Sequence, residues 1–259
     1  MTAVAYEFIE TGLSEGLYTI RLARPPVNVL HAPMMAEIEA ALDAAENDPD
    51  ARTVVITGHG MKVFSAGVEI ADHTPALMGR LIEDEHRFST RVRACTLPTI
   101  AALNGLALGG GLELALSCDM LVSVPDAKIG HPEIKLASIA FPGILMLQGR
   151  LPGNHIAELL TGGEPISGAQ AHRLGLVNAL IDPDDFQADV MRFASRFTSK
   201  SRPVLQLMVK TLKALRGKTL ETGFAEGSRI YMKELLPLED VNEGLAAFAE
   251  KRPPVWKHR

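Results

Sequence analysis

Apolar and polar positions follow two different spacings along the first 180 residues. Between residues 33 and 46, apolar side chains recur every three or four positions, which predicts an amphipathic helix. Short apolar runs that end at Pro, Gly, Asn or Asp predict strands. Strands are expected over 17–22, 53–57, 99–108, 120–124, 127–129 and 176–181. Helices are expected over 33–46, 76–93, 142–159 and 168–174, and another begins at 112–116.

The pattern changes after residue 183, where helical spacing continues with few strand signals. Strands that alternate with helices and then give way to helices predict an α/β core with a C-terminal helical extension. We place the core at residues 1–195 and the helical region at 196–259, as parts of one structural unit. No low-complexity segment or exact internal repeat indicates a second domain.

The composition indicates a globular protein whose core is mainly aliphatic. Of 259 residues, 47% are hydrophobic but only 5% are aromatic. The chain has 26 Lys and Arg residues against 31 Asp and Glu residues, so its formal net charge is −5. This acidic balance disfavours nucleic acid or an anionic membrane as the main partner.

Cysteine content and apolar segments indicate the expected cellular location of the protein. Two cysteines, Cys95 and Cys118, are too few for a disulfide scaffold, so we expect core residues in a reducing cytoplasm. The N-terminus lacks the basic and apolar regions of a secretory signal. The longest apolar stretch, 98–118, is interrupted by Asn104, Glu113 and four glycines, which predicts a buried segment and no membrane span.

Three consecutive glycines, Gly109 to Gly111, stand between an expected strand and an expected helix. They bring bare backbone close to its neighbours and leave the first N–H groups of the helix unpaired. Such donors suit a phosphate or a developing oxyanion, although glycines alone equally fit tight strand–helix packing. The dinucleotide fingerprint is excluded because Leu114 stands where its third glycine is needed, and no Lys-Ser/Thr pair completes a P-loop.

Two glutamates frame this region. Glu113 lies in the first turn of the expected helix, where a lone carboxylate commonly complements the helix dipole. Glu133 follows a short strand and a proline, a position that holds a side chain rigidly. Two carboxylates beside an anion-stabilising loop could share a water molecule, one removing a proton and the other delivering one. Spacing alone does not show that they meet.

Several segments in order resemble the crotonase, or enoyl-CoA hydratase/isomerase, family. The resemblance covers nearly the whole chain, and the combination of segments is far more specific than any one of them. The segments are Phe-Ser-Ala-Gly-Val-Glu-Ile at 64–70, Pro-Thr-Ile-Ala-Ala-Leu-Asn-Gly at 98–105, Gly-Gly-Gly-Leu-Glu-Leu at 109–114, Gly-His-Pro-Glu at 130–133, Leu-Thr-Gly-Gly-Glu-Pro-Ile-Ser at 160–167, Arg-Leu-Gly-Leu-Val at 173–177 and Glu-Gly-Leu-Ala-Ala-Phe at 243–248.

This resemblance implies a spiral of repeated ββα turns with a C-terminal helical region that mediates trimerisation. It implies an acyl-CoA thioester substrate, with CoA as part of the substrate and neither a separate cofactor nor a metal. A homotrimer or a homohexamer is the expected assembly, with no nucleic-acid or membrane partner. Hydro-lyase activity is the expected function.

The resemblance also assigns residues. By motif position, the backbone N–H groups of Val68 and Gly110 form the oxyanion hole for the thioester oxygen. Glu113 and Glu133 match the two glutamates with which hydratases of the family hold and activate water. Isomerases often lack one of them, so the presence of both favours hydration. Further residues are expected to contact the substrate: Pro26, Val27, Ala66, Ile70, His73, His131 and Gly143.

Departures from the family pattern narrow the range of expected substrates. Larger aliphatic residues at 144–147 replace the small ones that usually follow Pro-Gly, which indicates a reshaped acyl pocket. The turn at 24–28 is one residue shorter than the usual CoA-contacting turn. Segments 72–75, 125–130 and 250–256 resemble the cyclic dienoyl-CoA hydratases of anaerobic aromatic degradation, which hydrate cyclohexa-1,5-diene-1-carbonyl-CoA to 6-hydroxycyclohex-1-ene-1-carbonyl-CoA.

Two other functions remain open on sequence. One is double-bond isomerisation in an acyl-CoA, which needs a single proton shuttle. The other is a non-catalytic CoA-ester or RNA-binding member of the same fold, which the paired glutamates and the acidic balance disfavour.

Other polar groups also permit two readings. His73 either contacts the substrate or bonds to loop backbone. The run 83–86 (Glu-Asp-Glu-His) predicts a solvated helix face and no metal site, because its side chains point in different directions. Basic residues near the C-terminus either reach CoA phosphates or form a solvated face: Lys210, Lys213, Arg216 and Lys218.

Overall fold

The strands form two sheets in the structure, a computed structural model that describes residues 6–259. In spatial order, the larger sheet contains β1 (Ile9–Ser14), β2 (Leu17–Leu22), β3 (Thr53–Gly58), β5 (Thr99–Leu103), β7 (Met120–Ser123) and β10 (Ala179–Leu180). The smaller sheet contains β4 (Val63–Ser65), β6 (Leu106–Leu108), β8 (Lys128–Gly130) and β9 (Ile166–Ser167). The β1–β2 and β8–β9 pairs are antiparallel, and the other neighbours are parallel.

One order of elements repeats three times: a strand of the larger sheet, a strand of the smaller sheet and a helix. The first turn is β3, β4 and α2 (Met78–Ala94), and the second is β5, β6 and α3 (Gly110–Ser117). The third is β7, β8 and α4 (Phe141–Leu147). Because equivalent strands of successive turns pair in parallel, the chain advances as a spiral. The predicted α/β spiral of ββα turns is confirmed.

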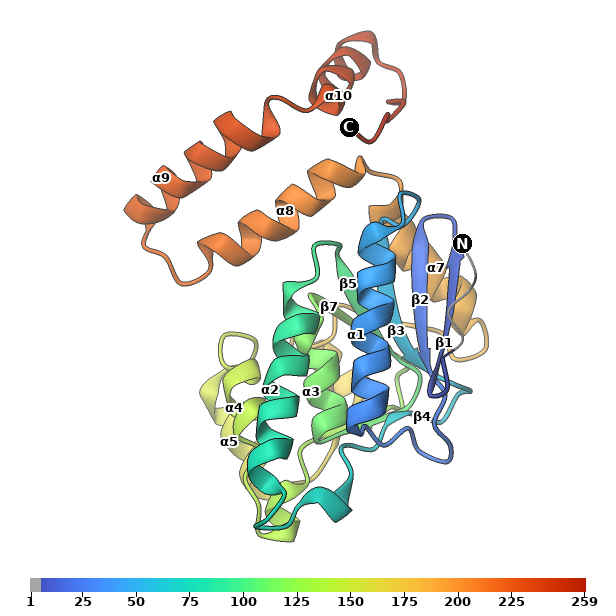
Figure 1. Cartoon of the computed structure of the whole chain (residues 1–259), viewed down its shortest axis with the longest axis vertical. Coiled ribbons are helices and arrows are strands. Elements are labelled where there is room, and N and C mark those ends of the chain that lie inside the picture. Colours follow the sequence, from blue (N-terminus) through green and yellow to red (C-terminus); the bar gives the residue numbers. More distant parts are fainter. Residues whose placement is uncertain (1–5) are drawn as a thin grey trace.

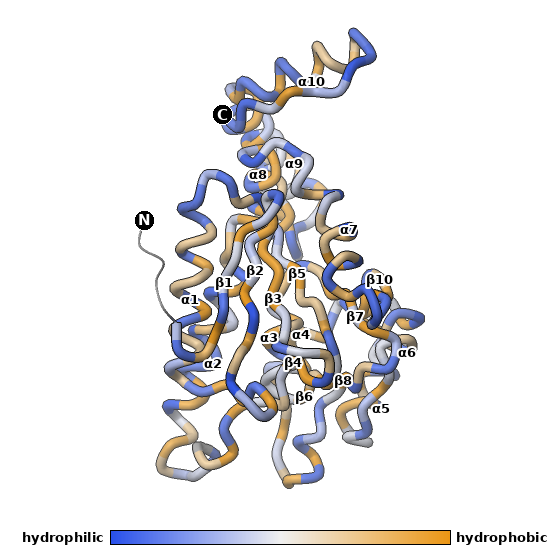
Figure 2. The backbone as a smooth tube through the Cα atoms, turned by 90° about the vertical axis from the view of Figure 1, so that its right-hand side faces the viewer, coloured by the Kyte–Doolittle hydropathy of each residue, from blue (hydrophilic) through white to orange (hydrophobic). Residues whose placement is uncertain are grey.

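Helices cover one face of the larger sheet, where α1 (Ala32–Asn47), α2 and α3 lie side by side (Figure 1). The predicted stripe of α1 is buried, with Ile38 and Leu42 fully covered. Hydrophobic segments concentrate along the central strands (Figure 2). Burying each aliphatic side chain contributes about 1.5–3 kcal/mol, so this mainly aliphatic layer holds the spiral together. Cys95 and Cys118 are buried in it as free thiols, as predicted.

The rest of the chain is mostly helical. The short connecting helices are η1 (Ile70–Asp72), η2 (Glu133–Leu136), α5 (Gly153–Gly162) and α6 (Gly168–Arg173). The C-terminal part contains α7 (Phe186–Thr198), α8 (Arg202–Leu215), α9 (Leu220–Ile230), η3 (Tyr231–Leu235) and α10 (Glu239–Glu250). Helices α8 to α10 extend beyond one end of the α/β core (Figure 1). Among the described residues, no helix is long and apolar enough to cross a bilayer.

Three sequence-based boundaries were wrong. The strand expected at 99–108 is two strands in different sheets, and Asn104 holds the corner between them by donating its amide N–H to the carbonyl oxygens of Gly60 and Val63. The helix expected at 142–159 is divided into α4 and α5, with Pro152 just before α5. The strand expected at 176–181 shortens to Ala179–Leu180, and β1, β4 and β9 were not predicted.

Candidate active site

Two backbone N–H groups meet where α3 begins. A Cβ atom built on Gly110 would lie 3.5 Å from the backbone nitrogen of Val68 and 2.6 Å from Val68 Cγ1. The amide of Gly110 opens α3, so it has no carbonyl partner within the helix. Among the described groups, the N–H of Val68 donates no hydrogen bond either. The structure therefore brings together the two residues that the sequence motifs assign to an oxyanion hole.

The backbone around Val68 is held rigidly. Leu30 donates its N–H to the carbonyl of Gly67 at 2.8 Å and accepts the N–H of Glu69 at 3.0 Å, so Val68 lies between two fixed hydrogen bonds. Gly67 has a φ of 124°, a conformation that side-chain-bearing residues rarely adopt. Gly67 and Glu69, on either side of Val68, make the two hydrogen bonds with Leu30, so the N–H of Val68 is left without an acceptor among the described groups.

Glu113 extends from the first turn of α3 into a buried space, and 6% of it is exposed. Its Oε1 accepts the N–H of Gly143 at 3.1 Å. Burial, followed by the nearby carboxyls of Glu85 and Glu133, raises the pKa of Glu113 to about 8. At neutral pH this side chain is mostly a protonated carboxylic acid that can donate a hydrogen bond.

Glu133 reaches the same space from the start of η2, directly after Pro132. Its Oε1 lies 3.3 Å from Nδ1 of buried His131, and its buried Oε2 has no hydrogen-bond partner among the described groups. Glu113, His131 and Glu133 each place one polar atom within 4.8 Å of the others. The two glutamates that were far apart in sequence therefore face a common point.

Two carboxylates and an imidazole are also common ligands of transition metals. Here His131 Nδ1 already bonds to Glu133, and Gly143 N already bonds to Glu113. One oxygen of Glu133 and the Nε2 of His131 remain without a described partner. This set fits one water molecule, which needs two to four polar partners at hydrogen-bond distance.

A third carboxyl, that of Glu85, lines this region and was wrongly expected on a solvated helix face. Glu83 and His86 are exposed as predicted, but Glu85 is half-buried. Its Oε1 lies 3.6 Å from the position of a Cβ built on Gly110. Burial raises its pKa to about 7, against a smaller lowering by His73 and with a further rise from Glu133.

The spacing of buried residues in α2 explains this position and was available in the sequence. Leu81, Phe88 and Val92 form the buried stripe of the helix. Glu85 stands four residues after Leu81 and three before Phe88, so it shares their face. A charged residue inside an apolar helical stripe was the signal for a functional side chain.

The other residues predicted to contact substrate fall into two groups. His131 and Gly143 are buried beside the glutamates, and a Cβ on Gly143 would lie 2.5 Å from His131 Nε2. Val27 accepts the N–H of Ala66 at 3.0 Å, which ties the turn after β2 to the turn after β4.

Pro26, Ile70 and His73 are exposed along the outer side of these turns. His73 Nδ1 lies 3.1 Å from the carbonyl oxygen of Glu69, so a backbone contact holds its ring. Substrate contact by these three residues stays a prediction.

A cavity of about 740 Å³ opens between α2 and α4. Glu85 lines it together with aliphatic and aromatic side chains of α4: Phe141, Pro142, Leu145 and Met146. The larger residues that depart from the family pattern at 144–147 therefore include two that shape this space, Leu145 and Met146.

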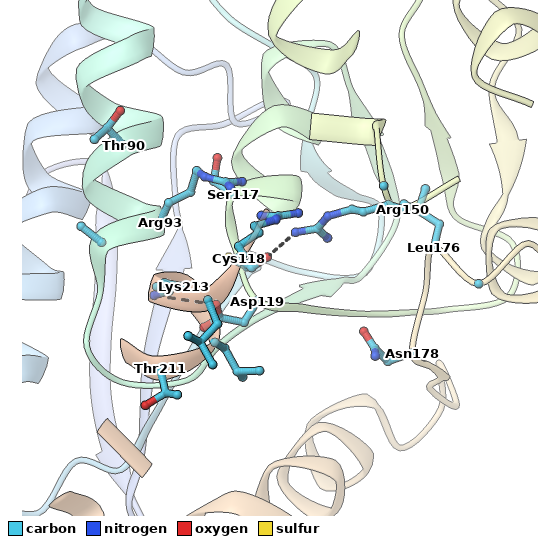
Figure 3. Close-up of a pocket in the computed structure, with 16 residues that line it drawn as sticks. Thr90, Arg93, Ser117, Cys118, Asp119, Arg150, Leu176, Asn178, Thr211 and Lys213 are labelled. Carbon is cyan, nitrogen blue, oxygen red and sulfur yellow. Dashed lines mark hydrogen bonds and ion pairs between the residues drawn. The ribbon is translucent and has the colours of Figure 1, made fainter. Parts of the chain in front are cut away.

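A second cavity of about 940 Å³ lies at the C-terminal end of α3 (Figure 3) and shares Thr90, Arg93 and Arg216 with the first. Arg93 and Arg150 enter it from different elements, and Lys213 lies 3.8 Å from Asp119. Arg150 donates to the carbonyls of Leu116 and Cys118, at the end of the helix.

The basic residues at 210–218, which the sequence left between CoA contact and a solvated face, lie in different surroundings. Lys213 and Arg216 line the cavity at the far end of α3, Lys210 forms an ion pair with Glu234, and Lys218 is exposed.

A pair of N–H groups beside converging carboxyls, at one edge of a ββα spiral, is suited to an enzyme that stabilises negative charge on a substrate oxygen while moving protons. The sequence profile described as enoyl-CoA hydratase/isomerase matches residues 12–259. The chain therefore belongs to the enoyl-CoA hydratase/isomerase family.

Known relatives agree with this assignment. The chain is 32% identical over 244 residues to the cyclohexa-1,5-dienecarbonyl-CoA hydratase of Thauera aromatica, covering 94% of this chain and 93% of that one. It is 34% identical over 260 residues to the crotonyl-CoA hydratase of Syntrophomonas wolfei, covering 96% and 97%. A crystal structure of an enoyl-CoA hydratase from Bacillus anthracis superimposes with a TM-score of 0.92 at 27% identity, over 98% of this chain and 100% of that one.

Proposed function

We propose that this protein is a hydratase that adds water reversibly to a conjugated acyl-CoA thioester. The cyclic substrate cyclohexa-1,5-diene-1-carbonyl-CoA, with 6-hydroxycyclohex-1-ene-1-carbonyl-CoA as product, is the specific reaction we favour. One observation carries the proposal: Glu113 and Glu133 converge within 4.8 Å, beside the free N–H groups of Val68 and Gly110.

The two N–H groups act on the thioester oxygen. When water adds to the conjugated double bond, electrons move into the thioester and its oxygen gains negative charge. The amides of Val68 and Gly110 are oriented before the reaction, so no reorganisation opposes their stabilisation of this charge. Each such donor is worth about 2.7–4 kcal/mol in the transition state.

The two glutamates hold the water. Glu113 is mostly protonated at neutral pH, so its hydroxyl can donate to the water oxygen. The partnerless Oε2 of Glu133 can accept a hydrogen bond from the same water and take its proton as the oxygen attacks. With an ordinary enoyl thioester, Glu113 then supplies the proton to the α carbon. Each acid or base step of this kind contributes about 10²–10⁴-fold to the rate.

The ring substrate is supported by the similarity to the Thauera aromatica enzyme and by the cavity between α2 and α4. The aliphatic side chains of Leu145 and Met146 enter that cavity beside Phe141. The aliphatic and aromatic side of this cavity, formed by α4, suits a compact carbocycle, because burying its CH₂ groups contributes about 0.8 kcal/mol each. Polar side chains such as Ser89 and Arg93 line the side formed by α2.

The deciding experiment compares hydration of crotonyl-CoA and of the cyclic dienoyl-CoA in ¹⁸O-water. We expect the label in the hydroxyl of the cyclic product and a higher kcat/KM for that substrate. A product without ¹⁸O would establish isomerisation instead. A strong preference for crotonyl-CoA would overturn the cyclic assignment while leaving hydration in place.

Matched variants test the glutamates. Glu113→Gln and Glu133→Gln should each lower kcat by at least about 10²-fold with little change in CoA-ester affinity. Glu158→Gln, on the exposed side of α5, makes the same charge change and should keep normal turnover. Near-normal activity in either active-site variant would remove that carboxyl from the mechanism.

We further propose that the protein assembles as a homotrimer or homohexamer in the cytoplasm. Large apolar side chains are exposed on the C-terminal helices, as expected of a surface that associates with other copies. They include Met208, Leu212, Leu220, Phe224, Met232, Leu245 and Phe248. Light scattering on the protein as it elutes from a size-exclusion column measures the mass of the assembly directly. The mass of a monomer would contradict this proposal.

A further inference from the structure

Glu85 presents a carboxyl to the reaction space without a partner that would explain its burial. Its Oε1 approaches Gly110, and its side chain lines the cavity between α2 and α4. Among the described groups it makes no hydrogen bond and no ion pair, unlike Asp84, which pairs with Arg87. A carboxyl that loses hydration on burial and gains no hydrogen bond or ion pair in return lowers stability, which a functional role would explain.

The charge state of Glu85 follows from its neighbours. Burial raises the pKa of Glu85 most; His73, which precedes α2, lowers it, and Glu133 from η2 raises it further. Glu85 in turn raises the pKa of Glu113 from α3. An ionised Glu85 beside Gly110 would oppose the negative charge that develops on the thioester oxygen. The neutral acid does not, and the raised pKa of about 7 makes that form available at neutral pH.

Hydration of the cyclic dienoyl thioester needs a proton at a carbon that ordinary enoyl hydration does not use. The ring carbon bearing the thioester, α, is doubly bonded to one neighbour, β, and the other neighbour, β′, is doubly bonded to γ′. In the product the hydroxyl is on β and the double bond joins α to β′. The water oxygen therefore bonds to β, electrons pass through α into the thioester, and γ′ receives the proton as they return.

We propose that Glu85 is the acid that delivers this proton to γ′, an inference that rests on the proposed cyclic dienoyl substrate. Glu133 takes the proton released by the attacking water, and Glu85 gives up its own. The substrate thus gains one water, and the enzyme is left with Glu133 protonated and Glu85 ionised. Its starting state returns when Glu133 releases a proton to solvent and partly exposed Glu85 takes one up.

A substrate analogue separates this step from water addition. Cyclohex-1-ene-1-carbonyl-CoA carries the α,β′ double bond and hydrogens on γ′ but has no hydroxyl to lose. In D₂O, removal and return of a γ′ proton exchanges it for deuterium, which mass spectrometry of the recovered thioester detects. We expect exchange in the wild type and in Glu133→Gln, and a loss of at least 100-fold in Glu85→Gln.

Controls distinguish this role from a structural one. Glu158→Gln, an exposed position on α5 outside the cavity between α2 and α4, should exchange as the wild type does. Glu85→Gln should still bind cyclohex-1-ene-1-carbonyl-CoA with wild-type Kd by calorimetry, and Glu85→Asp should recover part of the exchange. Exchange in Glu85→Gln within threefold of the wild type would overturn the role of Glu85. A wild type that fails to hydrate the cyclic dienoyl-CoA would instead overturn the proposed substrate.

Discussion

Replacing Glu113 with glutamine should make the protein more stable at neutral and alkaline pH while lowering kcat by at least about 10²-fold. The carboxyl is 6% exposed, and burial raises its pKa from 4.5 to about 8. Folding therefore favours the protonated form. The contribution of Glu113 to the stability of the wild-type protein is therefore fully present below the pKa of the unfolded state. It is lost as pH rises through the pKa of the folded state. Glutamine is neutral at every pH and avoids that loss.

The magnitude follows from the two pKa values. Each unit of difference corresponds to 1.36 kcal/mol, and a group that titrates at 4.5 when unfolded has lost about 3 kcal/mol of stability by pH 7. The loss approaches about 4 kcal/mol at pH 8 and is under about 1 kcal/mol at pH 5. Glutamine can keep the hydrogen bond from Gly143, because its Oε1 accepts as the carboxyl does.

Urea unfolding at pH 5, 6, 7 and 8 measures the difference. Protein concentration is held constant because assembly contributes to apparent stability. The gap between Glu113→Gln and wild type should widen with pH, while Glu158→Gln stays within about 0.5 kcal/mol of wild type throughout. A gap that does not change with pH, or a variant less stable than wild type at pH 8, would refute the electrostatic account of this site.

Two further substitutions test the oxyanion site and the C-terminal region. Gly110→Ala places a Cβ 2.6 Å from Val68 Cγ1, so it should displace the two N–H groups and lower kcat by about 10²-fold. A decrease in kcat of less than threefold would show that these amides do not contribute to catalysis. Asp240→Asn should lose about 1–3 kcal/mol of stability at pH 7 in urea unfolding. Although burial opposes it, the nearby Ser201 hydroxyl and the N–H groups of Lys257 and His258 hold the pKa of Asp240 below its usual range. The loss should therefore shrink as pH falls below about 4. A loss independent of pH would contradict the role of the charge.

The sequence predicted the succession of elements better than their corners. Amphipathic spacing identifies α1 and α2 to within about two residues, because one face of each helix is buried and the other is not. Periodicity fails at 99–108, where every strand residue after Thr99 is apolar and the chain changes sheets. Only Asn104 and Gly105 mark that corner, and a Cβ on Gly105 would lie 2.0 Å from the carbonyl oxygen of Lys62.

The site could be predicted only where a motif carried it. Glu113 and Glu133 are 20 positions apart in different elements, and no spacing rule shows that they converge. Glu85 belongs to no motif, and its run of charges suggested a solvated face. Its place in the stripe of Leu81 and Phe88 was the local signal, but only the packing of α2 on α3 shows what that face meets.

The spiral itself explains why so many functional groups meet at one edge. Val68 follows β4, Gly110 follows β6 and Glu133 follows β8, so each stands where a strand of the smaller sheet ends. Because these strands are parallel neighbours, the three junctions lie next to one another at their carboxyl ends, the edge where open α/β sheets bind ligands. The helices of the first two turns then bring Glu85 and Glu113 to the same edge. Repetition of one ββα unit thus gathers two N–H donors and three acids at one edge. Burial, with a smaller contribution from repulsion between the carboxyls, raises the pKa of Glu85 and of Glu113, so that protonated acid is present at neutral pH, as proton delivery to carbon requires.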